Sequence, residues 1–285
     1  MCFTVAVRSG RRVVSPGNAS SLNLNALVNK LIAVQVKIIS GEQLMSQFPN
    51  SRVNSLEYGH ANTGEKLLTQ FFHQVYLWMA VGIAVTALVS YGASLSPAAM
   101  TLVYGNTFGY IVLGLGAFAV SWFFPKVAMS ASLGVSTAVF LGYCALMGLL
   151  VSGIHRIYPS DTIAIAFLMT GGVFGIMSLL GFILKIDLSK IGAIVGMTVL
   201  GLFVASIVNI AFVKNEGFSW FITYGVLAAF IILTATQTQA LKNLALEHGA
   251  DNQLAPRIAL IGSLQLYIAF LNMFMAILRI LASRR

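Results

Sequence analysis

Seven long apolar runs constrain this chain more than any other feature. A helix that crosses the hydrocarbon core of a bilayer needs about 20 apolar residues. Enough runs are present for seven crossings: Val75–Ala93, Phe108–Phe124, Ala131–Gly153, Thr162–Leu184, Ile191–Phe212, Phe218–Thr236 and Ile258–Leu281. Hydrophobic residues make up 58% of the sequence and charged residues only 9%, which excludes an ordinary soluble domain. Because open strands cannot satisfy their backbone groups in lipid, we expect an all-α membrane protein, with seven transmembrane helices in one domain over residues 65–285.

Residues 1–64 differ from the remainder of the chain. They are polar and basic, and no acidic residue precedes Glu42. Three interpretations stay open: an organelle transit peptide, an interfacial helix, or a protein that truly starts at Met45. We favour the last of these. We expect residues 1–64 to form a disordered extension without stable tertiary contacts, because they lack a sustained apolar pattern.

The excess of basic residues reflects membrane topology rather than nucleic-acid binding. The chain has 17 Lys and Arg against 8 Asp and Glu, and multi-pass proteins carry extra Lys and Arg in their cytoplasmic segments. With a cytoplasmic N-terminus, that side carries Arg52, Lys66, Lys126, Lys185, Lys190, Lys242 and Arg257. The other side carries Arg156, Lys214, Arg279, Arg284 and Arg285. The bias predicts a cytoplasmic N-terminus, although a last segment that enters and returns would bring the terminal arginines to the same side.

No acidic residue lies inside an apolar run. The eight are Glu42, Glu57, Glu65, Asp161, Asp187, Glu216, Glu247 and Asp251. Ionisable groups inside the membrane are the usual functional residues of such proteins, so that signal is missing here. The four histidines, His60, His73, His155 and His248, do not have metal-ligand spacing. We therefore expect no enzyme, no metal site and no cofactor.

Neutral polar residues occupy patterned positions in the last three runs. Spacings of three and four place a stripe on the last run: Gly262, Gln265, Ala269, Asn272 and Ala276. One interpretation is interhelical hydrogen bonding, which stabilises a bundle modestly. The other is a polar pathway between the last three helices, for which the candidates are Gln237, Gln265, Asn272 and Asn209. The residues alone favour the first interpretation.

Four motifs follow one another along the chain: "MSLLGFILKIDLSKIG" (Met177–Gly192), "ASIVNI" (Ala205–Ile210), "LTATQTQALKN" (Leu233–Asn243) and "SLQLYIAFLNMFMAILRIL" (Ser263–Leu281). Together they resemble the Bax inhibitor family of transmembrane proteins, over residues 65–285. The resemblance implies a seven-helix bundle with the last helix in the centre, and the bacterial character of the motifs implies a bacterial inner membrane. Better-studied members of the family are associated with a pH-sensitive calcium leak and with stress or cell-death control. Some bacterial members are linked to membrane proteolysis.

The resemblance also implies what this chain lacks. The family's sixth-span motif usually reads Ala-Tyr-Asp-Thr-Gln, where residues 235–239 read Ala-Thr-Gln-Thr-Gln. The seventh-span motif usually reads Leu-Tyr-Leu-Asp-Phe-Ile-Asn, where residues 266–272 read Leu-Tyr-Ile-Ala-Phe-Leu-Asn. Gln237 and Ala269 therefore replace both aspartates of the family's proton-sensing pair. Two adjacent carboxylates share a proton and form a pH latch, which Gln and Ala cannot do.

Two functions follow as expectations. The first is a leak for calcium or another cation, in which neutral oxygens stand in for the missing carboxylates. Calcium prefers sets of oxygens that include carboxylates, so we expect weaker binding than in relatives with the acidic pair. The alternative is a non-conducting membrane scaffold that regulates a membrane protease or a stress or cell-death response. The expected partners are the lipid bilayer with a cation, or a membrane protein, and not nucleic acid.

Overall fold

The structure is a computed structural model that describes residues 61–105, 107–184 and 186–283. The regular elements within these ranges are helical: α3 (Ala61–Leu95), α4 (Pro97–Tyr104), α5 (Thr107–Ser130), α6 (Leu133–Val151), α7 (Ile154–Ile157), α8 (Ser160–Ile183), α9 (Ser189–Val208), the π-helical turn η1 (Asn209–Val213), α10 (Glu216–His248) and α11 (Leu254–Ala282). Among the described residues, seven helical spans are long and apolar enough to cross a membrane. The prediction of an all-α membrane protein with seven spans is confirmed. The predicted extension lies outside the described residues, except for 61–64 at the start of α3.

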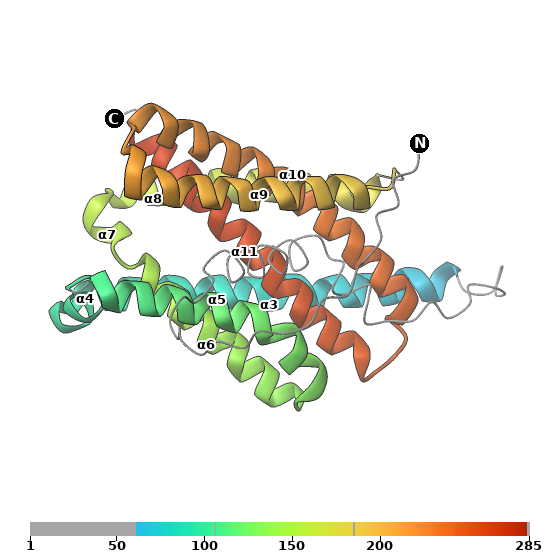
Figure 1. Ribbon diagram of the computed structural model, residues 1–285. Helices are drawn as coiled ribbons and strands as arrows, with labels where there is room; N and C mark the ends of the chain where they lie inside the picture. The colour runs from blue at the N-terminus through green and yellow to red at the C-terminus, as the bar shows by residue number, and fades with distance from the viewer. Residues whose placement is uncertain (1–60, 106, 185, 284–285) are drawn as a thin grey trace, which may run out of the picture.

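The last helix, α11, lies between two groups of helices. α3, α5 and α6 form one group and α8, α9 and α10 the other, while α11 runs obliquely between them (Figure 1). α11 packs against members of both groups and is the most deeply buried of the spans. Leu266, Tyr267, Met273 and Leu278 on this helix are fully buried. The expectation of a central last helix is confirmed.

The outer helices expose large apolar side chains instead of burying them. Leu88, Leu168 and Phe212 are 72%, 73% and 82% exposed. In water such exposure would be costly, whereas lipid tails are as apolar as leucine, so these side chains face a matching solvent. Helices in lipid then need close backbone packing to associate. The bundle provides it at glycines such as Gly181, where an added Cβ would overlap the carbonyl group of Ala235.

The helices lie where the apolar runs predicted them, but several helices end at other residues than the runs do. α10 continues well past Thr236 to His248, and α5 continues through Pro125 to Ser130. α4, which no apolar run predicted, is too short to cross a membrane. Its start is nevertheless marked in the sequence, because the side chain of Ser96 accepts a hydrogen bond from Ala99 N and Pro97 occupies the first turn.

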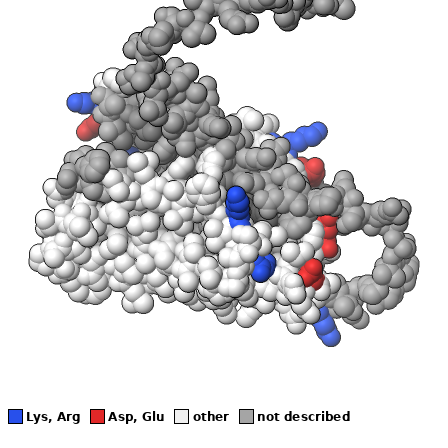
Figure 2. All heavy atoms as spheres, turned by 60° about the horizontal axis from the view of Figure 1, so that its bottom comes forward, with Lys and Arg blue, Asp and Glu red and all other residues white. Residues whose placement is uncertain are grey.

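The two sides of the bundle carry different connections. We call the side where α3 begins the N-side; it holds the α5–α6 turn and the α8–α9 and α10–α11 loops (Figure 1). The C-side holds α4, α7, the α9–α10 turn and the end of α11. Described basic residues of the N-side are Lys66, Lys126, Lys190, Lys242 and Arg257, and those of the C-side are Arg156, Lys214 and Arg279. Figure 2 shows charged side chains on the right of the view and at the upper left, with a broad described surface without charge between and below them.

Candidate functional site at the α10–α11 interface

The polar stretch of α10 is packed on three sides by small residues of neighbouring helices. Gly181 of α8 faces Ala235, Gly192 of α9 approaches Thr236, and Gly262 of α11 lies against the side chain of Leu241. Within the stretch, the hydroxyl groups of Thr234, Thr236 and Thr238 donate to carbonyl oxygens of their own helix, at 2.8, 2.9 and 2.8 Å. The threonines therefore satisfy themselves inside the bundle without a partner from water.

Gln237 is the exception in this stretch. Its Oε1 atom is buried, and none of the described residues donates a hydrogen bond to it. Gln237 precedes Leu241 by one helical turn and so shares the face of α10 that meets α11. The α10 and α11 helices run in opposite directions, and the side chain of Leu241 lies against Gly262. A residue one turn before Leu241 on α10 therefore lies at the level of a residue one turn after Gly262 on α11. The register thus places Gln237 at the level of Gln265.

Ala269 lies one turn further along α11. Its side chain is fully buried, so a methyl group fills the position that the resemblance assigns to an aspartate in relatives. The same register puts Ala269 near the level of Thr234, whose hydroxyl group is occupied by the Phe230 carbonyl. The two positions of the family's acidic pair are therefore a half-buried glutamine, whose Oε1 atom is buried, and a buried methyl group. Neither carries charge at any physiological pH.

The other two candidate residues lie farther toward the C-side. Asn272 follows Gln265 by about 10 Å along α11, and its Nδ2 atom donates to the Ile268 carbonyl at 2.8 Å. Asn209 closes the α9–α10 turn: its Nδ2 atom donates to the carbonyl of Asn215 at 3.2 Å, and its Oδ1 atom accepts from Asn215 N at 3.1 Å. The register therefore places Gln237 and Gln265 at the same level of the bundle, whereas Asn209 has a local structural contact. A continuous pathway stays a prediction.

Gln239 fastens the α8–α9 loop to α10. Its Oε1 atom accepts from Leu188 N at 2.7 Å, and its Nε2 atom donates to the carbonyl groups of Leu184 and Ile186 at 3.1 and 2.7 Å. A buried side-chain amide offers four hydrogen-bonding positions, and three of them are used here. The sequence alone does not reveal this role, because Gln237 has the same side chain and only packing distinguishes the two residues.

Two basic side chains on the N-side donate hydrogen bonds to backbone carbonyl groups near the ends of neighbouring helices. Lys242 Nζ donates to the Phe182 carbonyl at 2.7 Å and lies 4.7 Å from the centre of the Phe182 ring. Arg257 NH1 donates to the carbonyl groups of Ala128, Met129 and Ala131 at 2.7, 3.1 and 2.6 Å. These carbonyls terminate α5, where a helix leaves acceptors unpaired and favours a cation. In the sequence, both residues indicate only the membrane topology.

Hydroxyl groups link the outer helices across the bundle. The Tyr76 hydroxyl of α3 hydrogen-bonds Ser178 of α8, and Ser178 in turn lies 3.0 Å from Thr238 Oγ1 of α10. In α11 the Tyr267 hydroxyl lies 2.5 Å from Thr86 Oγ1 of α3. These contacts join neutral groups, so they fix the relative positions of helices without introducing charge into the bilayer.

In the N-side loops, the carboxylates of Asp187 and Asp251 accept hydrogen bonds from backbone N–H groups at the starts of α9 and α11. Asp187 accepts from Ser189 N at 2.9 Å and from the Ser189 hydroxyl at 2.5 Å, and these bonds lower its pKa. Asp251 accepts from Gln253 N at 2.8 Å and Leu254 N at 3.0 Å, which likewise lowers its pKa. Within the described residues, no three His, Cys, Asp or Glu side chains come close enough to hold a metal ion.

Comparison with known proteins points to one family. The family model described as "Inhibitor of apoptosis-promoting Bax1" matches residues 68–285. The inner membrane protein YbhL of Escherichia coli K12 is 37% identical over 219 residues, which cover 76% of this chain and 93% of the relative. An uncharacterized protein of Deinococcus radiodurans is 37% identical over 233 residues, covering 79% and 96%. One of Borreliella burgdorferi is 30% identical over 216 residues, covering 76% and 93%.

Proposed function

The chain belongs to the Bax inhibitor family of multi-pass integral membrane proteins, and we propose that it is a cation leak without the family's carboxylate latch. The conducted ions would include calcium, passing along the α10–α11 interface. Neutral oxygens of Gln237, Gln265 and Asn272 would line the route, with Asn209 at its C-side end. We further propose that the protein is not an enzyme.

The buried Oε1 atom of Gln237 carries this proposal. A buried acceptor without a donor costs roughly 1–3 kcal/mol, so a chain would be expected to avoid one at a purely structural contact. No described residue donates to this oxygen, whereas Gln239, two residues on, uses both ends of its amide. An oxygen of this kind is a ligand that hard cations accept.

We propose that the protein lies in a bacterial inner membrane with its N-side facing the cytoplasm. The relative from Escherichia coli is itself an inner membrane protein by name. The N-side carries more described basic side chains than the C-side, including Lys66, Lys126 and Lys190. This is the distribution that the positive-inside tendency of membrane insertion produces.

Calcium flux into proteoliposomes tests the leak. We expect entry of calcium above that of protein-free liposomes, and a loss of flux for Gln237→Leu, which removes the unpaired oxygen. Gln74→Leu is the matched control, since Gln74 is exposed on α3 and lies outside the interface. Equal flux for the two variants would contradict the assigned route.

A second candidate function is a non-conducting scaffold. It is supported by the side-chain hydrogen bonds that hold neighbouring helices and loops together on the N-side. Gln239, Lys242 and Arg257 each tie connections of different helices to one another, as expected for a rigid surface that a membrane protease or a stress-response protein could recognise. If the reconstituted protein conducts no cation at any pH, this candidate becomes the better one. Its own test is the rate of substrate cleavage by a co-reconstituted membrane protease, with and without the protein.

A further inference from the structure

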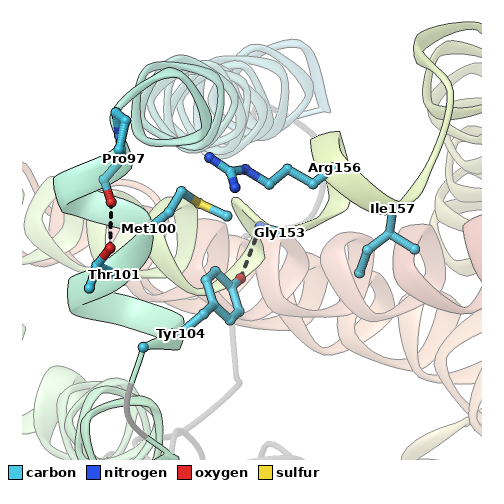
Figure 3. Close-up of a pocket in the computed structure, with 8 residues that line it drawn as sticks. Pro97, Met100, Thr101, Tyr104, Gly153, Arg156 and Ile157 are labelled. Carbon is cyan, nitrogen blue, oxygen red and sulfur yellow. Dashed lines mark hydrogen bonds between the residues drawn. The ribbon is translucent and has the colours of Figure 1, made fainter.

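A cavity of about 450 Å³ opens on the C-side between α4 and α7. It is separate from the α10–α11 interface, and nothing in the proposed leak uses it. Its size falls within the range of small-molecule sites in proteins. Met100 and Tyr104 of α4 form one wall, and Gly153, Arg156 and Ile157 form the other (Figure 3).

Arg156 gives this cavity its charge. Figure 3 shows the guanidinium group extending from α7 toward α4, across the mouth between the two walls. The residues that line the cavity include no carboxylate, and no hydrogen bond or ion pair ties the Arg156 side chain to another described residue. An arginine in such surroundings presents a planar set of donors that fits a phosphate group with two parallel hydrogen bonds.

The other polar groups of the wall are already engaged. The Tyr104 hydroxyl accepts from Gly153 N at 2.9 Å and donates to the Leu150 carbonyl at 2.7 Å. The Thr101 hydroxyl donates to the Pro97 carbonyl at 2.9 Å. The two Tyr104 bonds hold α4 against the end of α6, whereas the Thr101 bond lies within α4. With these groups engaged, Arg156 is the main free donor among the residues that line the cavity.

The α7 rim of the cavity is apolar and outward-facing. Ile157, which lines the cavity, is 71% exposed. Ile157 also ends the third membrane span, so the cavity lies at the depth where acyl chains meet headgroups. Arginine side chains near span ends reach toward the headgroup region. A ligand that suits both the cation and the rim has an anionic head and an apolar tail.

We propose that this cavity holds one anionic phospholipid of the surrounding bilayer. Its phosphate group binds the Arg156 guanidinium, and an acyl chain lies along Ile157. The lipid would pin α4 to α7 and so stabilise the C-side end of the bundle. This inference is independent of the proposed leak, because it concerns another side of the molecule.

The test is lipid binding to the purified full-length protein in a non-ionic detergent. Dioleoyl phosphatidylglycerol is the anionic probe and dioleoyl phosphatidylcholine the zwitterionic one, with bound lipid counted by native mass spectrometry and thermal stability measured alongside. We expect one retained phosphatidylglycerol and an affinity about tenfold lower for Arg156→Gln, as follows from losing a charge-assisted hydrogen bond. Lys214→Gln, at another exposed C-side cation, should bind normally.

A second variant separates the charge from the cavity. Thr101→Trp fills the space from an exposed position and keeps Arg156, so it should also weaken binding while leaving the bundle folded. If both variants bind phosphatidylglycerol as the natural protein does, the proposal is wrong. Equal binding of phosphatidylcholine would show that the site does not select an anionic lipid, which would contradict the proposal. Equal stabilisation by glycerol phosphate or inorganic phosphate would show that the site takes a soluble anion instead of a lipid.

Discussion

The Tyr267 hydroxyl of the central helix hydrogen-bonds the Thr86 hydroxyl of α3, at 2.5 Å between oxygens. Thr86 Oγ1 also lies 2.9 Å from the carbonyl oxygens of Gly82 and Cys144, so the threonine has acceptors of its own and the tyrosine donates to it. Tyr267 is fully buried. This contact joins α11 to α3 at a depth where no water can substitute for either group.

The two partners of this bond should respond unequally to mutation. Thr86→Val leaves the Tyr267 hydroxyl buried without its partner, which costs roughly 1–3 kcal/mol. Tyr267→Phe removes the donor and leaves Thr86 bonded to backbone carbonyls, so we expect a smaller loss of about 1 kcal/mol. Thermal unfolding in detergent compares the variants, with Ser94→Ala on the exposed end of α3 as the control. A greater loss for Tyr267→Phe would contradict the assigned direction of donation.

Glycines at helix contacts should tolerate no side chain. Gly192 approaches Thr236, with 3.3 Å between an added Cβ and Thr236 Cβ, while Gly92 has nothing within 4 Å. Gly192→Leu should therefore push α9 from α10 and lower the unfolding temperature in detergent, and Gly92→Leu should leave it unchanged. Gly196 is also buried on α9, and its leucine variant should resemble that of Gly192. Equal effects at Gly192 and Gly92 would mean that Gly192 does not form a tight contact.

Sequence predicts this fold well because a bilayer demands long apolar helices. Apolar length also explains why the ends of helices were predicted less well, because a helix can continue beyond its apolar run. The apolar run that ends at Thr236 stops where polar residues begin, yet α10 continues because Gln239 and Lys242 find backbone partners in neighbouring connections. Only tertiary structure supplies those partners. α4 was missed for another reason, because length is the main signal for a span and eight residues provide none.

The candidate site is less accessible to sequence reasoning than the fold. The stripe of small and polar residues on the last run was visible from spacing, and its members Gly262 and Ala269 are buried in the structure. Spacing does not separate a glutamine that fastens a loop from one whose oxygen is unpaired. Gln237 and Gln239 differ by two residues in one motif, and they face different neighbours because two helical residues subtend about 200°.

Loss of the Gln239 amide should release the α8–α9 loop. Gln239→Leu removes three hydrogen bonds to loop backbone and leaves buried carbonyl and N–H groups unpaired, so we expect a loss of roughly 2–3 kcal/mol. Hydrogen exchange at Leu188 should rise, while exchange in α6 stays unchanged. Gln74→Leu, on the surface of α3, is the matched control. Unchanged protection at Leu188 would show that the loop is held by other contacts.

The last prediction concerns the pH dependence of any cation flux. Gln237 and Ala269 do not ionise, so flux through the α10–α11 interface should be nearly flat between about pH 5 and pH 8. The capping residues Asp187 and Asp251 on the N-side add no pH dependence in this range. Hydrogen bonds lower the pKa of Asp187 and Asp251, so their stabilisation is complete above the ordinary aspartate pKa of about 3.9 and is lost only as pH falls through the lowered values.

Gln237→Asp combined with Ala269→Asp should create the missing dependence on pH. The register of α10 against α11 brings the two positions within about one turn of each other. Two carboxylates at that separation would share a proton at intermediate pH and repel once both ionise, which would bias a closed and an open arrangement. Calcium flux into proteoliposomes, measured across the same pH range, compares the natural protein with the double variant. Each single variant is a control, because one carboxylate has no partner with which to share a proton. Steep pH gating in the natural protein, unaffected by replacing His73, His155 and His248, would place the pH-sensing group outside this interface.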